Sequence, residues 1–184
     1  QMHDQKWLDI NAPVSSYISE FEFPDVDWKN KITVRDMMGH WTGMGRHDFS
    51  WYAQEHFSRD QIFSKIASLP LSFEPQTQYV YNNLMWTATG RITEIVGGQD
   101  WGEQVQENIL DPLNMKNTQL TLEAVLKQEN YSKPYVAQPN GAIEIPFYDL
   151  GDMAPAGGLY SNLEDMSHWI QFYLNKGKFQ GQRL

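Results

Sequence analysis

The segment from residue 78 to residue 98 limits the fold of this chain more than any other part of the sequence. A short strand-like run, Gln78-Tyr79-Val80, leads into Tyr81-Asn82-Asn83, and a helix-like run follows from Leu84 to Val96. Gly97-Gly98 then ends the run, because glycine readily adopts the left-handed conformation of a helix C-cap. The segment predicts a loop that enters a helix, with a phenol and a carboxamide placed where they could open onto a pocket.

Capping-box patterns predict further helices. Thr33-Val34-Arg35-Asp36 opens a helix from Val34 to about His40, and Ser58-Arg59-Asp60-Gln61 opens another that Pro70 ends. Ser161-Asn162-Leu163-Glu164 is a third such pattern, with Ser161 as the expected capping residue, and Gly177 closes the helix that follows. Apolar residues at helical spacing share one face of that last helix: Met166, Trp169, Ile170 and Tyr173.

The remaining segments complete the predicted fold class. Asn11-Ala12-Pro13 predicts a helix entry, residues 41–57 predict an irregular segment, and Asp100 starts a helix that ends before Pro112. Residues 121–129 predict a short helix, and residues 130–160 predict a loop with edge-strand pieces such as residues 142–145. The sequence therefore predicts a mainly α fold with short β-strands.

The composition fits a packed chain and excludes several classes of partner. The 184 residues suit one domain, or one domain and part of another, and seven Trp, nine Tyr and nine Phe argue against disorder. A net charge of −9 argues against binding to nucleic acid or to an anionic membrane, and no apolar run approaches the length of a membrane span. The absence of cysteine excludes disulfides, thiolate metal sites and a cysteine nucleophile.

Four stretches, in order along the chain, carry a resemblance to a known superfamily. They are Leu8-Asp9-Ile10-Asn11-Ala12-Pro13-Val14 with Tyr17-Ile18-Ser19-Glu20-Phe21; Ile32-Thr33-Val34-Arg35-Asp36-Met37-Met38-Gly39-His40-Trp41-Thr42-Gly43-Met44; Tyr81-Asn82-Asn83 with Gly90, Gly97 and Asp111-Pro112-Leu113-Asn114-Met115; and Pro155-Ala156-Gly157-Gly158-Leu159-Tyr160-Ser161 with Asp165. Together they resemble the serine β-lactamase and penicillin-binding-protein superfamily, in its class C-like and esterase-like branch. Gly39, Trp41 and Asn162 depart from the superfamily's pattern.

The nucleophile motif of that superfamily is absent from this chain. No Lys has a Ser three residues before it, so there is no Ser-x-x-Lys, and there is no Lys-Thr-Gly, His-x-Gly or Gly-x-Ser-x-Gly either. The resemblance implies that the Ser-x-x-Lys helix precedes residue 1 and that the Lys-Thr-Gly-like strand lies beyond residue 184. Residues 1–184 are then expected to be a single, partial domain: the helical region of an α+β hydrolase whose central sheet is largely missing.

The resemblance also assigns roles to Tyr81 and Asn83. Acyl transfer needs a nucleophilic hydroxyl, a base and donors for the oxyanion. Tyr81 would be the base that activates the serine and later protonates the leaving group, and Asn83 would orient the lysine and the substrate amide. A free tyrosine has a pKa of about 10 and needs a neighbouring ammonium to act as a base at neutral pH. We therefore expect this chain alone to show no turnover, and we expect no cofactor and no metal.

The substrate of the longer protein would be a small molecule or a peptide: a β-lactam, a D-amino-acid peptide or an ester. The resemblance implies a periplasmic or extracellular location. A non-catalytic binding module or pseudoenzyme of the same fold is the alternative, since Ser-x-x-Lys is missing, and a helical scaffold with accidental motif matches is a third interpretation. Apolar faces that would otherwise meet the sheet could drive self-association.

Other residues admit plainer interpretations. Tyr160-Ser161-Asn162 repeats the Tyr-x-Asn pattern, but a loop entering a helix explains it better. The histidines and acids at positions 40, 47, 48, 55 and 56 fit no compact metal-ligand spacing, and His40 is expected to be structural. The aromatic side chains of residues 41–52 could line a cleft, but core packing is the favoured account. The acidic residues Glu20, Glu22, Asp25 and Asp27 predict a solvated surface.

Overall fold

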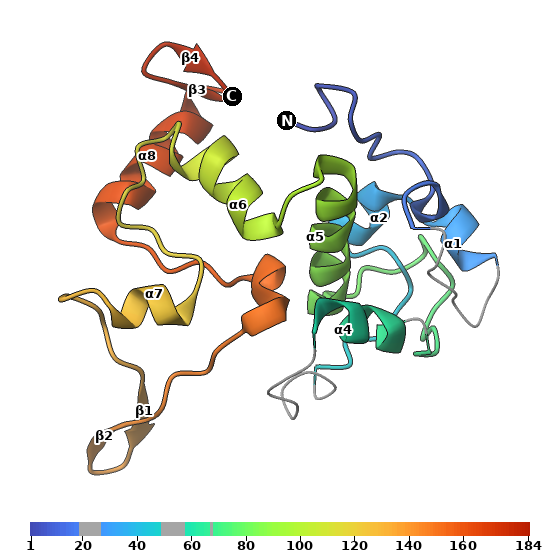
Figure 1. Ribbon diagram of the computed structural model, residues 1–184. Helices are drawn as coiled ribbons and strands as arrows, with labels where there is room; N and C mark the ends of the chain where they lie inside the picture. The colour runs from blue at the N-terminus through green and yellow to red at the C-terminus, as the bar shows by residue number, and fades with distance from the viewer. Residues whose placement is uncertain (19–26, 49–57, 67) are drawn as a thin grey trace.

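The structure is a computed structural model that describes residues 1–18, 27–48, 58–66 and 68–184 (Figure 1). The predicted mainly α fold with short strands is confirmed. The elements are η1 (Val14–Ser16), α1 (Trp28–Lys31), α2 (Val34–Gly39), α4 (Arg59–Ile66), α5 (Asn83–Gly97), α6 (Trp101–Val105), the π-helical turn η2 (Gln106–Leu110), α7 (Leu122–Leu126), β1 (Tyr135–Gln138), β2 (Gly141–Glu144), the 3₁₀ helix η3 (Gly151–Ala156), α8 (Leu163–Leu174), β3 (Lys178–Phe179) and β4 (Gln182–Arg183).

Helix α5 is the centre of the arrangement (Figure 1). It packs against α2, α4, α6 and η3, and it buries Leu84, Met85 and Ile92. The prediction for this helix is confirmed, although it begins one residue earlier, at Asn83. Gly98 ends it in the left-handed conformation (φ 71°), and its N–H donates to the Glu94 carbonyl.

The first two capping boxes are confirmed, and the third is wrong in its capping residue. Thr33 caps α2 together with Asp36, and the Gln61 N–H donates to the Ser58 hydroxyl at 3.3 Å. At α8 the cap is Asn162, whose Oδ1 accepts from the Asp165 N–H at 2.8 Å. The Ser161 hydroxyl lies instead 2.8 Å from the Thr118 hydroxyl. A cap thus needs the residue directly before the first helical turn, and Asn162 occupies that place.

Two hydrophobic clusters lie on either side of the α5–α6 connection. The larger one gathers residues of the N-terminal segment, α1, α2, α4 and α5, among them Trp28, Ile66 and Met85. The smaller one joins Leu110 and Leu113 to Phe179, which follows α8. The expected packed core is therefore present in two parts, and α8 belongs to the smaller one.

Close approaches fix η3 against α5. A Cβ added to Gly90 would lie 2.5 Å from Pro155 Cγ, so only glycine allows this contact. The Thr87 hydroxyl lies 3.2 Å from Met153 Sδ. Arg59 of α4 adds a bond from its Nε to the Asp152 carbonyl at 3.2 Å and pairs with Glu94 of α5. The largely buried guanidinium thus ties α4, α5 and η3 together.

The strands form two short antiparallel hairpins. β1 pairs with β2, with Val136 opposite Ile143, which confirms the predicted edge strand near residues 142–145. β3 pairs with β4 around Gln180 and Gly181, both at positive φ, and the sequence analysis did not anticipate this hairpin. None of the helices in the described ranges has the length and hydropathy needed to cross a bilayer.

Three expectations need correction. Residues 78–80 are not a strand, because the Val80 N–H meets only the end of α2, at the His40 carbonyl (2.9 Å). The expected helix after Pro13 is only the three-residue η1, with Pro13 as its cap. The helix expected over residues 121–129 is shorter, since α7 ends at Leu126.

Candidate active site

Tyr81 and Asn83 lie where the chain enters α5, beside the end of α2. The Tyr81 side chain is 40% exposed, and Asn83 is the first residue of the helix. Asn82 between them is fully buried and caps the helix: its Oδ1 accepts from the N–H groups of Leu84 (2.9 Å) and Met85 (3.3 Å). Its Nδ2 donates to the Gly45 carbonyl at 2.6 Å. The middle residue of the tripeptide therefore does the structural work.

This division leaves the outer two side chains free for other roles. Within the described part of the chain, the Asn83 carboxamide has no hydrogen-bond partner, while its carbonyl accepts from the Thr87 hydroxyl at 3.4 Å. Asn83 is partly buried, at the N-terminal end of α5, where the backbone N–H groups of the first turn carry a positive partial charge. The Tyr81 phenol and the Asn83 amide, next to this helix end, could bind and orient a polar or anionic group of a ligand.

The His40 ring packs against the turn formed by residues 79–82. Its ring centroid lies 4.5 Å from that of Tyr81, and Tyr79 approaches edge-on at 5.5 Å. The Asn82 N–H donates to His40 Nδ1 at 3.1 Å, and the Trp86 indole N–H points to Nε2 at 3.2 Å. Burial lowers the pKa of the His40 imidazole, because a buried cation loses its hydration. His40 was expected to be structural, and its bond to the Asn82 backbone fits that interpretation.

A cation also lies close to Tyr81. The Arg46 guanidinium carbon is 5.5 Å from the centre of the Tyr81 ring, within the range of a cation–π contact. Arg46 Nε donates to Asp48 Oδ2 at 2.7 Å, so its charge is partly balanced. The roles of Arg46, Asn82 and Trp86 could not be predicted from the sequence, because they depend on residues far away along the chain.

The second Tyr-x-Asn tripeptide has a different arrangement. At residues 160–162 the third residue, Asn162, is the helix cap, so its carboxamide is already engaged. Burial, and then the nearby Asp149 carboxylate, raise the pKa of the Tyr160 phenol, so the phenolate that could act as a base is less populated at neutral pH. The backbone of Tyr160 pairs with Gln119 through N–H to carbonyl bonds in both directions. The structural interpretation of this tripeptide is confirmed.

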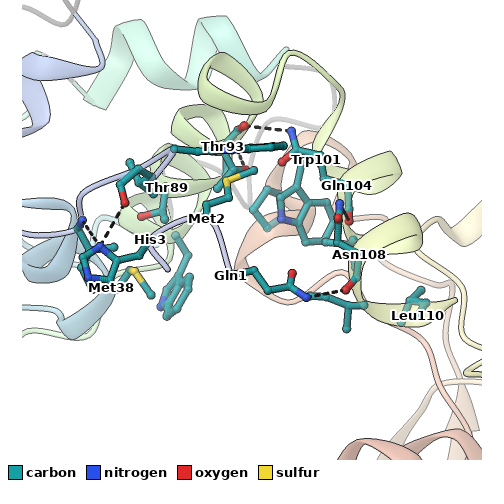
Figure 2. A pocket seen from close by; sticks show the side chains of 18 of the residues that line it. Gln1, Met2, His3, Met38, Thr89, Thr93, Trp101, Gln104, Asn108 and Leu110 are labelled. Atoms are coloured by element: carbon teal, nitrogen blue, oxygen red, sulfur yellow. Dashed lines mark hydrogen bonds between the residues drawn. The ribbon is translucent and has the colours of Figure 1, made fainter. Parts of the chain in front are cut away.

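A large apolar groove of about 770 Å³ lies next to this region. Figure 2 shows it between the N-terminal segment, α5 and α6, with the Gln1 amide donating to the Asn108 carbonyl at 2.9 Å. The side chains that line it include Met2, Trp7, Met38, Trp86, Trp101, Leu110, Met166 and Trp169. Tyr81 and Asn83 are not among the lining residues. Trp86 connects the two features, because it lines the groove and its indole N–H points to His40.

Several candidate residues lie outside the described residues. Three aromatic residues that could line a cleft are among them: Phe49, Trp51 and Tyr52. So are Glu55 and His56, which were considered as metal ligands, and the acidic residues Glu20, Glu22 and Asp25. Trp41 is described and is 41% exposed, which does not fit core packing. No group of three or more His, Asp or Glu side chains in the described ranges is placed to hold a metal ion.

The fold is that of the helical region of the β-lactamase and transpeptidase-like proteins. Over 96% of this chain it superposes on 42% of the octameric penicillin-binding protein homologue from Pyrococcus abyssi, with a TM-score of 0.77 and 18% identity. The sequence model of the family described as Beta-lactamase matches residues 1–184, and the chain belongs to that family.

Two of the curated relatives carry the names of a hydrolase and of an amidase. The chain is 31% identical to the unguisins hydrolase ungD of Aspergillus violaceofuscus over 78% of its length and 27% of the relative's. It is 25% identical to an N-acetylmuramyl-L-alanine amidase of Bacillus subtilis, over 96% of this chain and 46% of the amidase. The chain therefore spans about a quarter to a half of these relatives.

Proposed function

We propose that residues 1–184 are part of one domain of a serine hydrolase that acts through an acyl-serine intermediate. The observation that carries the proposal is that the middle residue of the tripeptide at 81–83, and neither of its neighbours, caps the helix. Asn82 takes the capping role, which leaves the Tyr81 side chain 40% exposed and the Asn83 carboxamide without a hydrogen-bond partner among the described residues. A tripeptide that served only to start a helix would not need these two polar side chains at the surface.

In this proposal Tyr81 is the general base and Asn83 the positioning amide. The serine and the lysine come from a Ser-x-x-Lys segment that is not part of residues 1–184. The lysine ammonium would favour the phenolate of Tyr81, which then takes the serine proton and returns it to the leaving group. Asn83 would hold the lysine and the amide or ester of the substrate in line for attack.

The apolar groove supports the same proposal. A helix that carries Ser-x-x-Lys needs a place to bury its apolar face next to Tyr81. Nearly half of the residues that line the groove are Met, Leu or Trp, and Trp86 of the groove also contacts His40, which packs against Tyr81. We propose that this segment of the longer protein packs into the groove, and that the chain without it is inactive.

The substrate class is an amide or an ester: a β-lactam, a D-amino-acid peptide or a small ester. Two relatives are named as a hydrolase of unguisins and as an amidase, which fits amide cleavage. The choice among these substrates depends on the nucleophile's surroundings, so the assay should include a penicillin-type probe, a D-alanyl peptide and a p-nitrophenyl ester.

The test compares Tyr81→Phe with Tyr160→Phe in the longer protein that carries Ser-x-x-Lys. Loss of the base should lower kcat by roughly 10²- to 10⁴-fold, whereas the control should keep its kcat because Tyr160 lies in the other, structural tripeptide. The isolated chain should give neither turnover nor an acyl adduct by mass spectrometry. Full activity of the Tyr81→Phe variant, or an adduct on the isolated chain, would refute the proposal. A longer protein without Ser-x-x-Lys would favour the non-catalytic binding module instead.

We also propose that the chain alone self-associates through α8. Ile170, Tyr173 and Leu174 are 52%, 76% and 73% exposed, and together they form a large apolar surface on one helix. The sequence analysis placed Ile170 and Tyr173 on an apolar face, and such a face exposed to water favours association. In the longer protein this face is the place for a sheet or a neighbouring segment.

A further inference from the structure

His40 is the residue on which most contacts of the Tyr81 turn converge. Its side chain is 7% exposed, and its ring touches Tyr79, Tyr81 and Trp86 and accepts from the Asn82 backbone. These partners follow it by about forty residues in the sequence. One buried ring thus contacts the candidate base Tyr81, Tyr79 before it in the sequence, and Asn82, which caps α5.

The backbone of His40 makes a further contact with the same turn. It is the C-cap of α2 in the left-handed conformation (φ 64°), and its carbonyl accepts from the Val80 N–H at 2.9 Å. Non-glycine residues adopt this conformation at a cost, and Asn, Asp and His are the side chains that occur there most often after glycine. His40 therefore holds residues 80 and 82 by one main-chain bond and one side-chain bond.

The two ring nitrogens face the same kind of partner. Nδ1 meets the Asn82 N–H and Nε2 meets the Trp86 indole N–H, and both partners are donors only. A neutral imidazole can accept at one nitrogen, and an imidazolium can accept at neither. The surroundings therefore select the neutral ring and offer it one donor more than it can satisfy.

Burial decides which donor is satisfied. Asn82 is fully buried and its backbone is fixed as the cap of α5, so its N–H cannot turn toward water, and leaving it without an acceptor would be costly. Trp86 is only partly buried and its side chain can turn about its own torsions. Nδ1 is therefore the acceptor, and the proton of the neutral ring resides on Nε2.

We propose that neutral His40, protonated on Nε2, is a positioning residue that sets the Tyr81 phenol and the Asn83 carboxamide relative to each other through its bond to the Asn82 N–H. The inference rests on the proposed function for its catalytic meaning, but not for its structural content. Protonation of His40 removes the acceptor and places a cation against two N–H donors, so acid should loosen the turn.

The neighbouring groups act in the same direction. Among the described residues, the titratable side chains that contact the His40 ring are the phenols of Tyr79 and Tyr81. A charged group near the stack is Arg46, whose guanidinium lies over the Tyr81 ring and is paired with Asp48. A further positive charge on His40 would repel Arg46, so none of these groups offsets the loss of the acceptor.

The first test observes this chain directly. Nitrogen-15 NMR of histidine-labelled protein should show His40 as the Nε2–H tautomer at pH 7, and the Asn82 amide proton should be shifted downfield by its imidazole acceptor. An Nδ1–H tautomer, or an imidazolium at pH 7, would overturn the inference. These signals do not depend on any hydrolase activity.

The second test uses a matched pair of substitutions. His40→Asn keeps an acceptor at the place of Nδ1 and tolerates the left-handed backbone, whereas His40→Gln moves the acceptor toward the place of Nε2. The Asn82 amide signal and the ring-current shifts of Tyr81 should persist in the asparagine variant and be lost in the glutamine variant. Circular dichroism of both variants checks that the helices remain. Equal behaviour of the two folded variants would refute the role of Nδ1.

The same pair in the longer protein tests the catalytic meaning. His40→Gln should lower kcat by roughly 10- to 100-fold with little change in KM, since the base is misplaced while the substrate site remains. His40→Asn should keep most of the kcat that His40→Gln loses. Because asparagine does not titrate, the fall of kcat at acid pH that is due to His40 should be absent from this variant. A change in KM alone would overturn the inference. No hydrolysis by the unmodified longer protein would instead refute the proposed function, and the NMR result would still decide the role of His40.

Discussion

Replacing Gly90 with alanine tests the contact between α5 and η3, on which the N-terminal part of the fold depends. Gly90 lies inside α5, where alanine normally gains about 1 kcal/mol over glycine in helix propensity. The added Cβ would, however, lie 2.5 Å from Pro155 Cγ and 2.6 Å from Pro155 Cβ. Carbon atoms in contact prefer about 3.5–4.0 Å, so α5 and η3 must move apart by roughly an ångström.

The sign of the effect follows from these two contributions. Overpacking of this kind costs about 2–3 kcal/mol, which exceeds the gain in propensity. Gly90→Ala should therefore lower the free energy of unfolding by about 1–2 kcal/mol. In a chain of this length, the midpoint of thermal unfolding falls by about 2–4 °C for each kcal/mol.

A double-mutant cycle isolates the contact. Pro155→Gly removes both atoms that the new methyl group would meet, and the cost of this change alone cancels in the cycle. In that background Gly90→Ala should be neutral or stabilising by up to about 1 kcal/mol, a coupling of about 2–3 kcal/mol. Urea unfolding followed by circular dichroism measures all four proteins. An equal effect of Gly90→Ala in both backgrounds would show that Pro155 is not the reason for glycine at this position.

Three further predictions concern charge, pH and association. Arg59→Met should lower the free energy of unfolding, measured in urea, by about 2–3 kcal/mol, since the Glu94 carboxylate keeps the Trp101 N–H but, among the described residues, only Arg91 as a cation; adding Glu94→Gln should recover part of the loss. Because burial lowers the pKa of His40, the unfolded chain binds more protons below about pH 6.5, so stability should fall with decreasing pH there. His40→Asn should reduce that slope, and an unchanged slope would contradict the assignment. Replacing Ile170 and Leu174 with serine should shift the isolated chain toward monomer in light scattering, and a wild-type monomer at high concentration would exclude the association.

Local signals in the sequence were sufficient for most helices. A cap is a contact between residues that are two or three positions apart, so Thr33 with Asp36 and Ser58 with Gln61 could be found from the sequence alone. The left-handed end of α5 at Gly98 follows from the same local rule. Among these caps, only the choice between two adjacent candidates, Ser161 and Asn162, was wrong, because Ser161 has a distant partner in Thr118. The local signals after Pro13 and over residues 121–129 also predicted longer helices than η1 and α7.

The candidate site depends on contacts that the sequence does not display. The stack of His40 on Tyr81, the bond from Trp86 and the cation of Arg46 join residues more than thirty positions apart. The motif order indicated Tyr81 and Asn83, but it could not show that Asn82 is the cap. The exposure of the α8 face was equally hidden, since its apolar pattern is that of a helix packed against a core.

The two Tyr-x-Asn tripeptides show why a motif has meaning only in its helical register. In both, the chain enters a helix in an extended conformation and an Asn side chain satisfies the first free N–H groups. At residues 160–162 the cap is the third residue, and its carboxamide is used up. At residues 81–83 the cap is the second residue, so the third lies one position inside the helix, and its side-chain amide has no partner in the part of the chain that the structure describes. A shift of one residue thus separates a structural turn from a candidate catalytic one, and a substitution that moved the cap from Asn82 to Asn83 should abolish the site while leaving α5 intact.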